Sequence, residues 1–131
     1  MATRGFVGTG SNVLIAGFIV GGPTPKRVLI RAIGPSLAAY GLDGLLAQPV
    51  LTIVDSTNKV VTQNTGWANN NATASQAQIT LVTNLTGAFP IQPTSADSVV
   101  LTTLAPGAYT AQVSGANTTT GTALVEVYQL P

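Results

Sequence analysis

The fold is decided by the stretch SVVLTTLAPGAYTAQVSGANTTTGTALVEVYQL, residues 98–130. Its apolar runs are rich in Val, Leu and Thr and are separated by turn residues, which is typical of short strands. Pro106-Gly107 marks a tight turn, and residues 117–120 close the next hairpin. This pattern predicts three consecutive antiparallel strands, at 98–104, 108–114 and 122–130.

The rest of the chain repeats the same pattern. Runs of β-branched and aliphatic residues alternate with Gly, Pro, Asn and Asp. Eight or so short strands, with turn signals at intervals of roughly ten residues, predict an all-β fold. We expect one antiparallel, jelly-roll-like β-sandwich domain over residues 1–131. The remaining strands are predicted at 5–9, 13–20, 26–33, 50–54 and 59–63.

One or two short helices are expected between the strands. Ser36 is a predicted N-cap for a helical turn at 37–40, which Gly41 ends. Residues 73–85 leave two alternatives open. Apolar residues at helical spacing favour a helix there, although Ile79–Thr83 read alone is equally typical of a strand.

The charge content excludes several classes of protein. Charged residues make up 7% of the 131 residues, and the net charge is +1. Disordered chains need high charge and low hydrophobicity, and nucleic-acid binding needs a basic stripe, so neither class fits. A net charge near zero also removes the repulsion that keeps proteins apart. The composition therefore favours association with another copy or with a partner surface.

We expect no metal, no cofactor and no catalytic activity. The chain has no His and no Cys, which excludes the usual zinc sites and any His-dependent triad. Its four acids, Asp43, Asp55, Asp97 and Glu126, are dispersed along the sequence and suggest no paired-carboxylate site. Asp55 begins a hairpin turn, where its side chain is expected to close the turn itself.

Arg31 and Glu126 stand in the middle of two predicted strands, among aliphatic residues. A charge on a half-buried strand usually needs a partner. One alternative is that these side chains clamp a ligand. The other, which we favour, is a structural ion pair between neighbouring strands that fixes their register.

The segment 1–22 is uncharged after Arg4 and ends in Gly21-Gly22. Its unbroken apolar run, Val13–Val20, is too short for a membrane span, and no convincing cleavage site follows it. We therefore interpret the run as a strand. It is either the first strand of its own sandwich or a strand exchanged with a neighbouring subunit.

Five runs of the chain carry a resemblance: RGFVGTG (4–10), NVLIAGFIV (12–20), KRVLIRAIGPSL (26–37), LAPGAYTA (104–111) and GTALVEVY (121–128). They resemble an uncharacterised module of large secreted bacterial proteins. The C-terminal half is also similar to the bacterial pre-peptidase C-terminal domain, a β-sandwich appended to secreted enzymes. The resemblance implies an extracellular or cell-surface accessory module and supplies no catalytic residues. The loop at 64–67 lacks the acids usual in that family, which weakens any cation site further.

Two functions remain in view. The first is an extracellular structural protein that associates with itself, in filaments if strand exchange runs head to tail. Its subunit contacts would come from the apolar residues Val13, Leu14, Ile15, Phe18, Ile19 and Val20. The second is a secreted module that binds a glycan or cell-surface polymer, with Trp67 and Tyr40 stacking on sugar rings.

Overall fold

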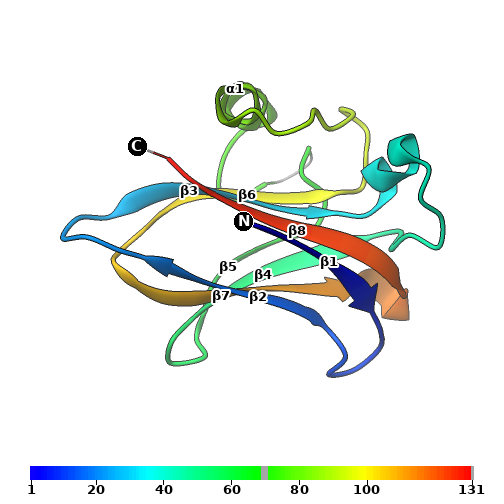
Figure 1. Ribbon diagram of the computed structural model, residues 1–131, viewed down its shortest axis with the longest axis horizontal. Helices are drawn as coiled ribbons and strands as arrows, with labels where there is room; N and C mark the ends of the chain where they lie inside the picture. Colours follow the sequence, from blue (N-terminus) through cyan, green and yellow to red (C-terminus); the bar gives the residue numbers. More distant parts are fainter. Residues whose placement is uncertain (69–70, 131) are drawn as a thin grey trace.

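The computed structural model describes residues 1–68 and 71–130. Two four-stranded antiparallel sheets pack face to face (Figure 1). The first sheet has the order β1-β8-β3-β6, and the second has the order β2-β7-β4-β5. The strand bounds are β1 Ala2–Val7, β2 Leu14–Val20, β3 Lys26–Ile33, β4 Pro49–Asp55, β5 Val60–Asn64, β6 Ser98–Leu104, β7 Gly107–Gly115 and β8 Gly121–Gln129.

The predicted antiparallel β-sandwich of eight strands is confirmed. The main difference in bounds is at the start of the chain. The first strand begins at Ala2 and not at Gly5, because Ala2, Thr3 and Arg4 pair with the middle of β8, residues 124–126. A pattern that counts apolar residues does not detect a strand whose first half is polar and exposed.

The segment at 73–85 is a helix, as favoured, and α1 spans Gln76–Thr86. A capping box starts it: the Ser75 hydroxyl accepts from the Gln78 backbone N–H, and the Gln78 side chain accepts from the Ser75 N–H. Gly87 ends the helix with a φ of 75°, a left-handed conformation that favours glycine.

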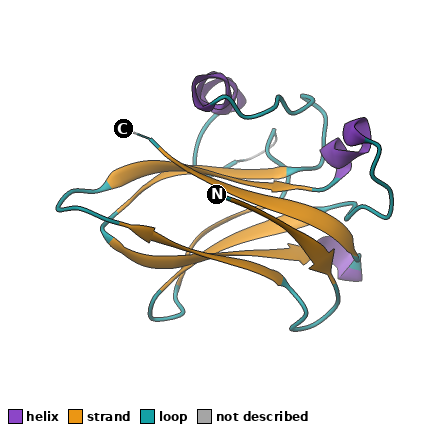
Figure 2. Ribbon diagram, viewed as in Figure 1, coloured by secondary structure: helices purple, strands orange, loops and turns teal. Residues whose placement is uncertain are grey.

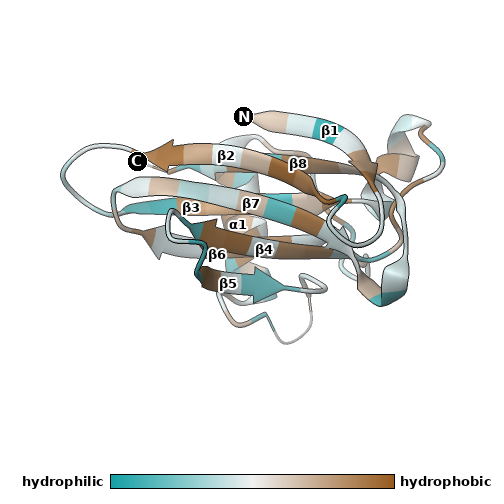
Figure 3. Ribbon diagram, turned by 90° about the horizontal axis from the view of Figure 1, so that it is seen from below, coloured by the Kyte–Doolittle hydropathy of each residue, from teal (hydrophilic) through white to brown (hydrophobic). Residues whose placement is uncertain are grey.

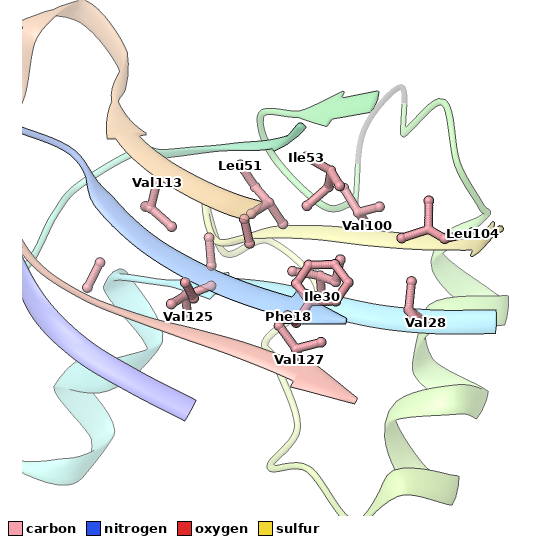
Figure 4. Close-up of a cluster of buried hydrophobic side chains, with 14 of the residues drawn as sticks. Phe18, Val28, Ile30, Leu51, Ile53, Val100, Leu104, Val113, Val125 and Val127 are labelled. Atoms are coloured by element: carbon pink, nitrogen blue, oxygen red, sulfur yellow. The ribbon is translucent and has the colours of Figure 1, made fainter. Parts of the chain in front are cut away.

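The core lies between the two sheets (Figure 4). Side chains of alternate residues point inward, as the period of two in a strand requires. Ile30 of β3 and Val125 of β8 meet there with Phe18, Leu51 and Val113 from the opposite sheet. Burial of these apolar side chains, at roughly 25 cal/mol per Å², is the main stabilising contribution.

The two outer faces of the sandwich differ. The helix α1 and the short 3-10 helix η1, Pro35–Tyr40, lie on the outer side of the β1-β8-β3-β6 sheet (Figure 2). Beneath α1, Leu29 and Val99 join Trp67, Ile79 and Val82 in a second buried cluster. β3 is therefore buried on both faces. The outer face of the β2-β7-β4-β5 sheet bears no helix in the described part of the chain.

Candidate functional site

Arg31 and Glu126 lie directly opposite each other on β3 and β8. Arg31 Nε is 2.9 Å from Glu126 Oε1, and the Arg31 side chain is completely buried. Arg31 Nη1 donates a 2.7 Å hydrogen bond to the carbonyl oxygen of Phe89, and the Phe89 ring covers the guanidinium at 4.4 Å. The Nε–Oε1 contact is an attraction between charges and not a well-directed hydrogen bond. Because the guanidinium has no exposed surface, the ligand-clamp alternative has no route to a ligand.

Tyr128 extends this buried cluster toward the surface. Its hydroxyl donates a 2.6 Å hydrogen bond to Glu126 Oε2. Partial burial raises the pKa of Tyr128 to about 12, with further contributions from this hydrogen bond and from the charge of Glu126. The phenol is therefore held in its neutral, donating form.

We expect the stability of the protein to fall between about pH 10 and pH 12 through Tyr128. In this window the folded state keeps the phenol proton, because its pKa is about 12, whereas the unfolded chain releases it near 10. Rising pH therefore favours the unfolded state. Melting temperatures of the wild type and Tyr128→Phe over this range measure the effect. The variant should lose less stability, Tyr40→Phe should follow the wild type, and identical curves for all three would contradict the assignment.

Asp97 forms a second buried polar cluster that the sequence did not predict. Its Oδ1 accepts from the backbone N–H of Gly34 at 2.7 Å and from that of Ser36 at 3.3 Å. Its Oδ2 accepts from the hydroxyls of Ser36 and Ser95. The carboxylate is completely buried and ties the corner after β3 to the start of β6. The N-cap role predicted for Ser36 is wrong, because Ser36 lies inside η1 and donates to Asp97, while Gly34 occupies the N-cap position.

The two candidate stacking residues have different environments. Trp67 is only 3% exposed, and its Nε1 donates to the carbonyl oxygen of Gln92 at 3.2 Å. The stacking role predicted for Trp67 is therefore wrong, since its ring belongs to the buried cluster under α1. Tyr40 is 59% exposed and lies 5.1 Å from the Phe89 ring, beside a groove of about 470 Å³ that Ser36 and Gln92 also line.

The N-terminal segment lies in its own sandwich. β1 pairs with β8, and β2 pairs with β7. Phe18 and Val20 point into the core, and Val13 and Leu14 are half-buried. Two of the six predicted contact residues are exposed, Ile15 at 53% and Ile19 at 69%.

The edge strand β6 is closed by side chains from the end of β5 and from the segment that follows it. Asn64 Oδ1 accepts from the backbone N–H of Val99 at 2.9 Å, and Asn71 Nδ2 donates to the Val99 carbonyl at 2.8 Å. Thr73 Oγ1 accepts from the N–H of Leu101 at 3.2 Å. These bonds occupy backbone groups that would otherwise be a template for another strand.

Two further edges carry milder protection. β1 has the exposed Arg4 in its middle. β5 has only five residues, and its pairing with β4 is irregular between Ile53 and Val54. A charge, a short length and a bulge all discourage edge pairing.

The edge formed by β2 has no charge, no bulge and no covering loop among the described residues, and one side-chain hydrogen bond, from Gln129 to the Ile19 carbonyl oxygen, lies on it. It is seven residues long, regular in its pairing with β7 and without charge (Figure 3). Ile15 and Ile19 add exposed apolar side chains to it. Among the described residues, β2 is the edge best suited to accept another strand.

Comparison with known proteins supports the fold. No protein-family model matches this chain, and no curated protein sequence matches it. The chain is similar in structure to the pre-peptidase C-terminal domain of collagenase from Bacillus anthracis, with a TM-score of 0.56 and 14% sequence identity. The match covers 98% of this chain and 88% of that domain, so the shared architecture extends over both sheets.

Proposed function

We propose that this protein is a non-catalytic extracellular module that associates with copies of itself through the open edge of β2. The observation that carries the proposal is the contrast between β2 and the other edges. Edge strands of proteins are usually protected by charges, bulges or covering loops. A long, regular, apolar edge strand without these features, such as β2, pairs readily with a strand of another chain. The low charge of the chain adds little repulsion between copies.

The extracellular setting is supported by the fold. The chain shares the architecture of the pre-peptidase C-terminal domain of a collagenase. The resemblance of its sequence to that family implies a module of secreted proteins. None of the helices in the described part of the chain is long and apolar enough to span a bilayer. Export and surface location are tested by fractionating the host cells.

The non-catalytic character is supported by the roles of the acids. Glu126 faces Arg31, and Asp97 accepts four hydrogen bonds from the chain itself. Asp55 accepts from the Thr57 hydroxyl and from the backbone N–H groups of Thr57 and Lys59, and these bonds lower its pKa. Three of the four acids therefore stabilise local structure.

Sedimentation velocity over a wide range of protein concentration tests the proposal. We expect the wild type to shift from monomer to oligomer as concentration rises. Ile15→Lys/Ile19→Lys should raise the dissociation constant by about tenfold or more, because it removes apolar contacts and places like charges along the pairing edge.

The control is Val60→Lys/Val61→Lys, which adds the same charge at the exposed residues of the opposite edge strand, β5. It should associate like the wild type. A wild type that stays monomeric at millimolar concentration, or equal weakening by both double variants, would refute the proposal.

A second candidate function is glycan binding at the groove beside Tyr40. The exposed Tyr40 ring and the polar groups of Ser36, Gln92 and Ser95 border the same 470 Å³ hollow. Aromatic faces with a few adjacent polar groups suit sugar rings. Titration with soluble polysaccharides, with Tyr40→Ala as the variant that should lose binding, separates this function from self-association.

A further inference from the structure

We infer that the association is a two-fold dimer in which β2 pairs antiparallel with β2 of a second copy, with Gly17 opposite Gly17. The inference rests on the proposed function, and it specifies the surface, the register and the symmetry of that association. It also predicts a closed dimer in place of a filament.

The free edge of β2 is identified by one hydrogen bond. Gln129 Nε2 donates to the carbonyl oxygen of Ile19 at 2.8 Å, so this carbonyl points away from β7. In an antiparallel ladder the N–H and C=O of one residue point to the same side, and alternate residues share that side. The outward backbone groups of β2 are therefore those of Ile15, Gly17 and Ile19.

The register follows from the sequence of the strand. A two-fold axis at Gly17 places the strand LIAGFIV antiparallel to its copy, with all seven residues of each strand paired. Ile15 then lies opposite Ile19 of the second copy, on the solvent side of the sheet, at both ends of the pair. In this register each of the three outward-facing residues lies opposite an outward-facing residue of the second copy. Each of these three pairs forms two backbone hydrogen bonds, so the shared edge has six.

A second copy suits this edge better than a charged peptide does. β2 contributes no charge, so a copy of itself brings neither repulsion nor an unpaired ion to the contact. Side chains directly opposite each other across a ladder are in contact, and the two Ile15–Ile19 pairs provide apolar contacts of this kind. Gly17 leaves the axis free of side chains. The exposed Gln129 side chain must release Ile19, which costs one solvent-exposed hydrogen bond.

The symmetry makes the assembly finite. The contact is isologous, because the same strand is used on both sides, and it consumes the open edge of both copies. The result is one continuous sheet of eight strands with β5 at each end. Further growth of this sheet would have to use β5, which is shorter and irregularly paired.

Single cysteines test the register, because the chain has no Cys of its own. A Cβ added at Gly17 meets no atom within 4 Å, so Gly17→Cys is compatible with the fold. Directly opposed residues of such a pair have Cα atoms about 5.5 Å apart, which suits a disulfide. We expect Gly17→Cys to form a covalent dimer under mild oxidation at micromolar concentration.

The isoleucine positions provide the matched controls. Ile15→Cys alone should not cross-link, because the two copies of residue 15 would be about 14 Å apart along the strands. A mixture of Ile15→Cys with Ile19→Cys should give the heterodimer. Val61→Cys on β5 should give no covalent dimer at the same concentration.

The outcomes distinguish an error in the Gly17 register from an error in the proposed self-association. A protein that associates, but in which Gly17→Cys cross-links no faster than Val61→Cys, overturns this inference and leaves the proposed function standing. Cross-linking of Ile15→Cys with itself overturns the Gly17 register. A wild type that is monomeric at every concentration overturns both.

Discussion

Glu126→Gln is expected to lower the free energy of unfolding by about 3–5 kcal/mol, a drop of about 10–20 °C in melting temperature. Glutamine keeps the shape of the side chain and removes its charge. The Arg31 guanidinium then stays fully buried with the Phe89 carbonyl as its acceptor and no anion beside it. An unpaired buried charge costs more than the pair contributes, so the loss is large although the ion pair itself is worth little.

Thermal and urea unfolding measure this loss. Asp43→Asn changes the net charge by the same amount at an exposed acid and should leave stability within about 0.5 kcal/mol. Arg31→Met/Glu126→Leu replaces both charges by apolar groups and should be more stable than Glu126→Gln, because Arg31 Nη2 already lacks an acceptor among the described residues. If Glu126→Gln has the same melting temperature as the wild type, the ion pair has no structural role.

Asp97→Ala is the second large effect, with an expected loss of about 2–6 kcal/mol. The variant leaves the backbone N–H groups of Gly34 and Ser36 without their acceptor, and an unsatisfied buried donor costs about 1–3 kcal/mol. The hydroxyls of Ser36 and Ser95 lose the same carboxylate. The corner between β3 and η1 should loosen together with the start of β6.

Amide hydrogen exchange locates this effect. In Asp97→Ala the amides of Gly34 and Ser36 should exchange much faster relative to those of the β2-β7-β4-β5 sheet. Ser95→Ala removes one donor and leaves the carboxylate in place, so it should cost about 1 kcal/mol. Equal losses in Asp97→Ala and Ser95→Ala would show that the carboxylate does not hold the corner.

The strands could be predicted because their signals are local. Alternation of apolar residues and the Gly, Pro and Asn turns between the runs are visible within ten residues. The structure has strands at the apolar runs and turns between them. The placement of Arg31 and Glu126 within such runs also indicated that each needs a partner, and the two meet in the register of β3 and β8.

The Asp97 cluster and the burial of Trp67 could not be predicted in this way. Asp97 lies 61 to 63 residues from Ser36 and Gly34, and no periodicity connects them. Trp67 stands in a polar loop, which indicated exposure, but that loop folds over β3 and β6 and buries the ring. Side chains of irregular segments depend on where the segment packs, and this information is not local.

The position of β8 in its sheet has a consequence for the order of folding. β8 is the last strand of the chain, yet it lies between β1 and β3, and β1 is bonded to it alone. While the chain is being synthesised, β1 has no strand to join, and the charged side chain of Arg31 has no anion until Glu126 is made. Such long-range pairing gives a high contact order and slow folding. The four-stranded sheet is therefore complete only after synthesis reaches β8. Until then β3 can pair with β6 on one side, and its other edge stays open to strands of neighbouring chains.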